Sequence, residues 1–333
     1  MKLLATAQGE SSLYLGKKYA TGPFVAFSLL LVLFFSCSKG KGSSSNKEIQ
    51  IKEIDTQLVE RTAQKTNTSA QAKEYYNQGV LYQEQGMQEK AIKEFKETIQ
   101  LRPDYAEAYN NIGTSYQFLG KYDKAIQSYR KSVEVQPDLI EGYHNLGTLH
   151  LLQGEIDQAI TAYKGVIHFQ PELATAYIDL GRAYGMSGQL DQAIDQFKMA
   201  LNLDSNLLEA HYALGVSYRH QGMIDVATES LEKVIAQKPD FTEAHLNLGY
   251  AYRDQDKLTE AVDAFNTASQ IDPNNYQVFH ELGVTYMKQQ RYTEAAIAFQ
   301  QALKIRPEAV QTENNLKVAQ ARLAQQLSRF DVG

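Results

Sequence analysis

One spacing of 34 residues constrains this chain more than any other feature. Seven glycines follow one another at that distance: Gly79, Gly113, Gly147, Gly181, Gly215, Gly249 and Gly283. Twelve residues after each glycine stands an alanine, and four residues further on stands a large apolar side chain such as Phe95. A fixed period of this length predicts one small structural unit that is repeated and stacked on itself.

The residues within one period predict a pair of helices joined by a tight turn. A second glycine, such as Gly86, can adopt the left-handed conformation that ends a helix. Asp256 and Gln290 replace this glycine in the last two units, where we expect a more strained turn. A proline closes six of the seven units, and the polar residue after it, such as Asp104 or Asn274, is expected to cap the next helix.

This pattern resembles that of the tetratricopeptide repeat family over residues 72–309. The resemblance implies an all-α fold, a right-handed α-solenoid (superhelix) of seven 34-residue helix-turn-helix repeats whose first helices line a concave inner wall. The predicted repeats are 72–105, 106–139, 140–173, 174–207, 208–241, 242–275 and 276–309. In the remaining segment, 310–333, Leu316, Ala319 and Leu323 share one side of a predicted helix, which we expect to cap the last repeat.

The composition argues against several classes of function. The 333 residues carry a formal net charge of -6 and show no long basic stripe, which disfavours nucleic acid as a partner. The single cysteine, Cys37, excludes an internal disulfide and a cysteine-based zinc site. No Gly-x-Ser-x-Gly elbow and no glycine-rich phosphate loop occurs. The sequence therefore predicts a non-catalytic protein with neither a cofactor nor a metal site.

An apolar segment near the N-terminus predicts export from the cytoplasm. Phe24–Phe35 contains twelve residues with only one polar side chain, and Lys17 and Lys18 precede it. This length fits the core of a signal peptide, about 7–15 residues, better than a membrane span of about 20 residues. The stretch Leu33–Cys37 resembles a bacterial lipoprotein signal, which implies that Cys37 is lipidated.

Two alternatives to the lipoprotein signal stay open, an uncleaved membrane anchor and a cleaved signal with an incidental cysteine. We expect residues 1–37 to form the export segment and residues 38–71, which begin rich in glycine, serine and lysine, to form a flexible linker. The expected location is the cell envelope, with the protein anchored at the periplasmic face of the outer membrane. An uncleaved anchor would instead place it at the inner membrane.

The inner wall is predicted to carry a row of asparagines two residues before the period glycine. The row comprises Asn77, Asn111, Asn145 and Asn247. It resembles the row in the repeat superhelix of O-linked N-acetylglucosamine transferases, where the amides hold the backbone of an extended peptide. An amide offers both a donor and an acceptor, which suits a peptide unit whatever its side chain. The alternative is that these are ordinary surface asparagines.

Two further groups of residues on the inner wall are candidate partner contacts. Apolar side chains gather in the second to fourth repeats: Phe118, Leu151, Leu152, Ile178 and Met186. They either anchor a partner's apolar residues or pack against the neighbouring repeat. Arginines gather in the fourth to sixth repeats: Arg182, Arg219 and Arg253. They either receive carboxylates of a ligand or are neutralised within the protein by Asp179 and Asp254.

Together these features predict an exported, membrane-tethered scaffold that binds a protein or an extended peptide in its groove. The chain resembles envelope lipoproteins of the same repeat family that help to assemble outer-membrane machines. Two other functions stay open: a non-catalytic subunit that presents substrates to an envelope enzyme, and a structural oligomer built by end-to-end stacking.

Overall fold

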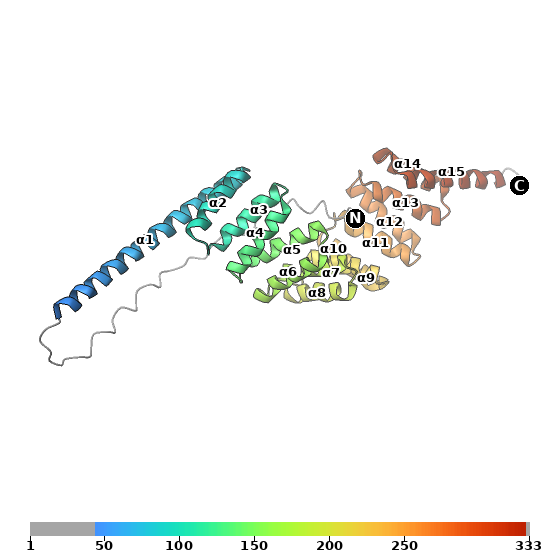
Figure 1. Ribbon diagram of the computed structural model, residues 1–333. Helices are drawn as coiled ribbons and strands as arrows, with labels where there is room; N and C mark the ends of the chain where they lie inside the picture. The colour runs from blue at the N-terminus through green and yellow to red at the C-terminus, as the bar shows by residue number, and fades with distance from the viewer. Residues whose placement is uncertain (1–43, 331–333) are drawn as a thin grey trace. The chain divides into compact units, whose positions relative to one another are not determined.

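The computed structural model describes residues 44–330, which form helices joined by short turns and contain no strand (Figure 1). The helices are α1 (Ser44–Glu84), α2 (Gln88–Leu101), α3 (Ala106–Phe118), α4 (Tyr122–Val135), α5 (Ile140–Gln153), α6 (Ile156–Phe169), α7 (Ala174–Met186), α8 (Leu190–Leu203), α9 (Leu208–His220), α10 (Ile224–Gln237), α11 (Thr242–Asp254), α12 (Leu258–Ile271), α13 (Tyr276–Lys288), α14 (Tyr292–Ile305) and α15 (Val310–Phe330). The prediction of an all-α solenoid of helix pairs is confirmed.

The chain divides into two compact parts, Met1–Ala63 and Gln64–Gly333, and the second part holds the stack of helix pairs. The helix α1 runs across this division, so the flexible linker predicted for residues 38–71 is helical from Ser44 onward. No glycine or proline occurs between Ser44 and Gln78, so nothing interrupts a helix that continues into the first repeat. Within α1, Ala72 is fully buried, and it marks where the helix joins the packed stack.

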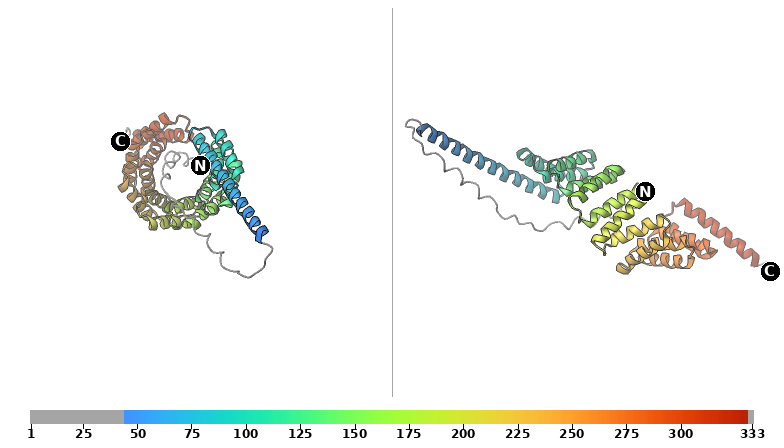
Figure 2. Two further views of the ribbon diagram at one scale, coloured as in Figure 1. Left: turned by 90° about the vertical axis from the view of Figure 1, so that its left-hand side faces the viewer. Right: turned by 90° about the horizontal axis from the view of Figure 1, so that it is seen from below.

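The helices within Gln64–Gly333 pack in chain order. From α3 on, the first helix of a pair packs against its own second helix and against the second helix of the preceding pair, as α7 does with α8 and α6. First helices also approach one another, since α3 contacts α5, and α9 contacts both α7 and α11. Successive second helices make no comparable contact within residues 64–330. The first helices therefore lie on the inner side of the stack, whose successive pairs Figure 2 shows from two further directions.

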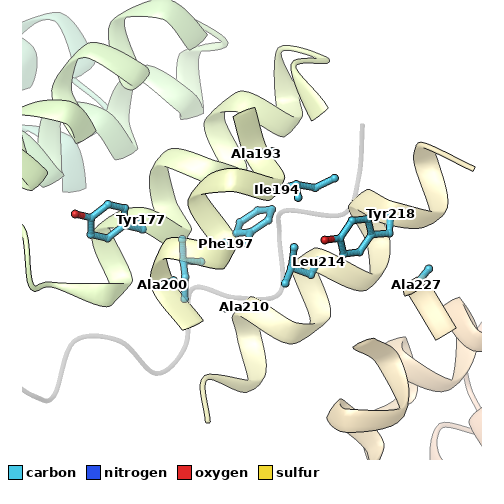
Figure 3. Packing of buried hydrophobic residues seen from close by; sticks show 10 residues of the cluster. Tyr177, Ala193, Ile194, Phe197, Ala200, Ala210, Leu214, Tyr218 and Ala227 are labelled. Atoms are coloured by element: carbon cyan, nitrogen blue, oxygen red, sulfur yellow. The ribbon is translucent and has the colours of Figure 1, made fainter. Parts of the chain in front are cut away.

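The period glycine allows the two helices of each pair to approach closely. A Cβ atom on Gly181 would lie only 2.5 Å from Cε1 of Phe197, and one on Gly113 would lie 2.6 Å from the ring of Tyr129. Phe197 then packs with Ile194 from its own helix and with Leu214 from α9, which joins the fourth pair to the fifth (Figure 3). The small residue thus sets the distance between helices, and the ring that covers it belongs to the core between pairs.

The turns within the pairs have the predicted left-handed residue. Gly86, Gly154 and their equivalents have positive φ, and so do Asp256 (59°) and Gln290 (60°). A residue with a Cβ is strained in this region, with aspartate better tolerated than glutamine. The last two turns are therefore less relaxed than the glycine turns, as the sequence indicated.

The prediction that the residue after each proline caps the next helix is wrong. The N-cap lies one residue later. In the first helices α3, α5, α7, α9 and α11 it is apolar or aromatic, as in Leu139 and Phe241, and makes no side-chain cap bond. Asn275, rather than Asn274, caps α13 by accepting a hydrogen bond from the backbone N–H of Gln277. Leu139 is 8% exposed, so burial of an apolar side chain takes the place of a polar cap.

The last helix, α15, covers the seventh pair as expected. Thr312 and Ala319 are fully buried, and Leu316 packs on the cluster that contains Phe299. Another side of α15 carries an exposed ion pair, with Nζ of Lys317 2.6 Å from Oε1 of Glu313. A helix that buries one side on the seventh pair and carries charge on another ends the stack.

The packing of the period glycine predicts opposite results for two glycines of α7. We expect Gly181→Ala to lower the free energy of unfolding by about 1–3 kcal/mol, because the new methyl group overlaps Phe197. Gly185→Ala is the matched control, because its Cβ would lie 4.0 Å from the nearest atom, Cβ of Ala193. It should leave stability unchanged or raise it by about 0.5–1 kcal/mol through helix propensity. Urea unfolding followed by circular dichroism measures both, and equal stabilities would contradict this account.

Candidate partner-binding face

The asparagine row lies on the first helices, and its amide groups bond to the preceding first helix. Asn111 Nδ2 donates to the hydroxyl of Tyr76 at 3.1 Å, and Asn145 Nδ2 donates to Oδ1 of Asn110 at 2.9 Å. Each acceptor stands 35 residues before its asparagine, so one spacing joins each pair of repeats. These N–H groups are therefore engaged within the protein, and what the asparagines can still offer a ligand is their carbonyl oxygen.

The two ends of the row differ in their environment. Asn247 is 9% exposed, and its Nδ2 donates both to the hydroxyl of Tyr212 at 3.1 Å and to the backbone oxygen of Glu243 at 2.8 Å. Asn77 belongs to α1, where no helix pair precedes it, and it is exposed. We did not predict from the sequence that the asparagines join neighbouring repeats. The signal for it is the tyrosine or asparagine that stands 35 residues before each of them except Asn77.

In the fourth and fifth repeats other residues make the same inter-repeat contact. His144 Nε2 lies 3.2 Å from Oδ2 of Asp179, again 35 residues away. Ile178 and Ala213 have the same separation and form an apolar version of it, within one core cluster. Ile178 is only 1% exposed, so the prediction that it lines the groove is wrong. Its side chain fills the contact that polar pairs make in the neighbouring repeats.

Three predicted apolar residues are exposed and share one position in successive repeats. Phe118, Leu152 and Met186 are 74%, 54% and 40% exposed, and they lie at or next to the C-terminal ends of α3, α5 and α7. We call these three side chains the apolar row. Leu151 is only partly buried and packs on the cluster around Tyr163, so for this residue packing against the protein accounts for its apolar character. Exposed apolar side chains that recur at adjacent positions are typical of an interaction surface.

Each of the three predicted arginines is paired with a carboxylate. Arg182 contacts Asp179 on its own helix and Glu209 on the next first helix. Arg219 NH1 lies 3.6 Å from Asp254. The structure thus favours internal neutralisation over an acidic ligand for this group.

The last two arginines also hold an aromatic ring between them. Tyr250 has the guanidinium carbons of Arg219 and Arg253 at 5.1 Å and 5.3 Å from its ring centre. Arg253 NH1 lies 2.6 Å from Oε2 of Glu281, and the Tyr250 hydroxyl accepts a hydrogen bond from Nε2 of Gln277 at 2.7 Å. Burial, chiefly, raises the pKa of the Tyr250 hydroxyl. This cluster, largely out of water, is a rigid polar contact between repeats rather than an open anion site.

The histidines of the described part of the chain make contacts within the repeats. Within residues 44–330 no group of three His, Cys, Asp or Glu side chains is arranged to hold a metal ion. The Nε2 atoms of His211 and His245 lie 3.0 Å and 2.9 Å from the backbone oxygens of Ser205 and Pro239, which ties each first helix to the turn before it. The ring of His150 contacts Glu155.

The predicted export segment precedes the part of the chain that the structure describes. Cys37 and Phe24–Phe35 lie outside the described residues. Among the helices that are described, none is long and apolar enough to cross a bilayer.

Comparison with known protein families identifies the repeat. Sequence models described as "Tetratricopeptide repeat" match residues 106–139, 276–309, 140–172 and 208–241. A model described as "TPR repeat" matches residues 79–120, 181–222 and 249–290. No curated protein matches the chain in sequence.

Several solved structures resemble the chain in fold. The C-terminal part of a TPR repeat-containing protein from Cytophaga hutchinsonii is 17% identical, with a TM-score of 0.59 over 72% of this chain and 99% of that one. A tetratricopeptide repeat protein from Parabacteroides merdae is 17% identical, with a TM-score of 0.58 over 75% and 99%. The APC/C hetero-tetramer Cut9-Hcn1 gives 21% identity and a TM-score of 0.54, and the match covers 68% of this chain but only 45% of that chain. At these identities the likeness concerns the fold alone.

The contact between His144 and Asp179 predicts a pH-dependent link between repeats. The hydrogen bond that the His144 ring donates to Asp179, opposed in part by burial, raises the pKa of His144 above its ordinary value of 6.5. The protonated form is favoured in the folded state, so its stabilisation is complete below pH 6.5 and is lost as pH rises through the raised pKa. NMR titration of full-length protein should show a pKa above 6.5 for His144.

Asp179→Asn is the variant that tests this origin of the shift. It should lower the His144 pKa, because the partner loses its charge. His220 in the fifth repeat serves as the control. Its pKa is lowered chiefly by burial, and Asp179→Asn should leave that pKa unchanged. A His144 pKa that is the same in both proteins would rule out Asp179 as its cause.

Proposed function

Because this chain belongs to the tetratricopeptide repeat family, whose members mediate protein–protein interactions, we propose that it is a scaffold that binds an extended segment of a partner protein along its inner face. The observation that carries the proposal is the apolar row, with three large side chains exposed at one position of adjacent repeats. Of the other candidate groups, the three arginines and Asn111, Asn145 and Asn247 are engaged in contacts between repeats.

The spacing of the apolar row defines the kind of segment that fits it. Packed helices lie about 8–10 Å apart, and an extended chain rises about 3.3 Å per residue, so three residues span one repeat. In a strand residues i and i+3 point to opposite sides, so apolar residues at i, i+3 and i+6 can meet all three members of the row only in an extended conformation with three residues per turn. A polyproline II segment, with three residues per turn and a rise of about 3.1 Å, presents these positions on one face.

The proposed binding region ends at the fourth repeat. In the following repeats the same position is occupied by His220, Asp254 and Lys288, which are polar. Asp254 lies 3.6 Å from Arg219, so part of this continuation is used within the protein. The fifth to seventh repeats thus extend the scaffold, and the second to fourth repeats carry the apolar anchor.

Binding of such a segment can be tested with selected peptides. Peptides selected for binding to full-length protein should carry apolar residues at every third position. Phe118→Gln combined with Leu152→Gln should weaken their binding by at least tenfold, because two burials worth about 1.5–3 kcal/mol each are lost. Fluorescence anisotropy with labelled peptide measures the affinity.

The matched control for this experiment is Ile297→Gln on α14, because Ile297 is 61% exposed on a second helix. It removes an equally exposed apolar side chain and should leave peptide affinity unchanged. If the double variant bound the selected peptides as tightly as the unaltered protein, the apolar row would not be the binding site.

We further propose that the scaffold is tethered in the cell envelope through its N-terminal segment. The support is in the sequence, where the apolar stretch Phe24–Phe35 is followed at once by a cysteine. A lipid on Cys37 would hold the protein at the periplasmic face of the outer membrane, and the repeats would then act on exported proteins.

Membrane fractionation tests the tether. Cys37→Ala should move the protein from the membrane fraction, or leave it as a larger unprocessed form, because a lipoprotein signal is processed at the modified cysteine. Cys37→Ser is an equally conservative second variant and should behave identically. A protein of unchanged size in an unchanged membrane fraction would exclude lipidation and favour the uncleaved anchor.

A further inference from the structure

A second surface, away from the apolar row, departs from the repeat in one place. Three residues after the period glycine, six repeats have a tyrosine, and the third repeat has His150. In five of these six a cation lies over the tyrosine ring: Lys90 over Tyr82 at 5.4 Å, Lys124 over Tyr116 at 5.7 Å, Lys164 over Tyr184 at 5.7 Å, Lys198 over Tyr218 at 5.8 Å and Arg291 over Tyr286 at 4.6 Å. The cation stands eight residues after the tyrosine in the first two repeats and five residues after it in the last. In the fourth and fifth repeats it stands 20 residues before the tyrosine, on the second helix of the preceding repeat.

The third repeat has a cavity at this position instead of the ring. His150 is 4% exposed, and its Nδ1 lies 2.5 Å from Oε2 of Glu155. A cavity of about 320 Å³ between α4, α5 and α6 is lined by His150, Arg130 and Asp157, among others. His150 contributes the smaller imidazole to this lining, and the imidazole contacts Glu155. The volume is at the lower end of the range for ligand pockets and suits one ring with the chain that carries it.

The cavity keeps a cation at the position that covers the ring in the fourth and fifth repeats. Arg130 stands 34 residues before Lys164, as His150 stands 34 residues before Tyr184, and Lys164 lies over Tyr184. Arg130 is exposed and takes part in none of the hydrogen bonds, ion pairs or ring contacts found within residues 56–328. The third repeat therefore has a cavity and a cation, Arg130, beside it, but it lacks the tyrosine ring of the other six repeats.

We propose that this cavity binds a tyrosine side chain of a partner protein. The occupant is identified by the protein itself, because the same position holds its own tyrosine in six other repeats. The guanidinium of Arg130 would lie over the ring face, an attraction of about 0.5–1 kcal/mol at an exposed site. Asp157 lines the cavity with a carboxylate, which accepts a hydrogen bond from a phenolic hydroxyl. The site is independent of the apolar row and does not need the inner face to be occupied.

The test uses N-acetyl-tyrosinamide as the probe and saturation-transfer NMR on the full chain. N-acetyl-tyrosinamide should give a saturable signal with the unaltered protein, and N-acetyl-leucinamide should give none. His150→Tyr should abolish the signal, because the new ring fills the cavity as it does in the other repeats. Its thermal midpoint, measured in parallel, should not fall, which shows that the lost signal does not reflect unfolding.

A second pair of variants tests the cation. Arg130→Gln should weaken binding of the probe about two- to fivefold, which corresponds to the attraction of one cation to a ring. Lys164→Gln, the equivalent change one repeat later, should leave binding unchanged because Tyr184 already occupies that position. The proposal is overturned if the unaltered protein gives no tyrosine signal, or if a folded His150→Tyr variant retains it. Equal binding of the leucine probe would overturn it as well.

Discussion

The contact between a glycine on one helix and a large side chain on its partner is the interaction on which the rest of this structure depends. In six of the seven repeats that side chain is an aromatic ring, and in the fifth it is Leu231, which meets Gly215. The absence of a Cβ lets the helices of a pair come close, and the side chain that fills the gap also reaches the core shared with the next pair. The distance within a pair and the stacking between pairs are therefore set by one contact, and its repetition fixes which residues of every first helix face inward.

The same repetition produces a second spacing, of 35 residues, that joins neighbouring first helices. Asn111 with Tyr76, Asp179 with His144 and Ile178 with Ala213 are three chemical versions of one contact. The contact changes from polar to apolar in the middle of the stack. It engages side chains that could otherwise bind a partner. Groove residues of a repeat protein therefore serve two roles that compete, since a side chain bonded to its neighbour has less to offer a partner. The apolar row stands outside this competition, because its members are exposed at or next to the C-terminal ends of their helices.

The architecture could be predicted from the sequence because it depends on residues that recur at the same position of every 34-residue repeat. The left-handed residue in each turn, including Asp256 and Gln290, and the capping role of α15 were visible for the same reason. The site was less predictable, because phase tells which way a side chain points but not whether another residue engages it. Ile178 and Phe118 both fall on inward phases, yet one is buried and the other is 74% exposed. The prediction of the helix caps failed for a related reason, since N-cap side chains such as Tyr105 and Leu207 pack against core clusters.

Departures from the repeat are informative because stacking alone favours the same residue in every unit. His150 replaces a tyrosine that would fill a cavity and meet a cation, so it forgoes packing that the other repeats have. Phe118 leaves an apolar ring in water, which stacking does not require. A side chain that costs stability, or adds none, in only some units of a regular array is best explained by a contact that the isolated protein does not make. Such positions lie in the second to fourth repeats on both surfaces, which makes this region the part of the scaffold where partners are most strongly expected to bind.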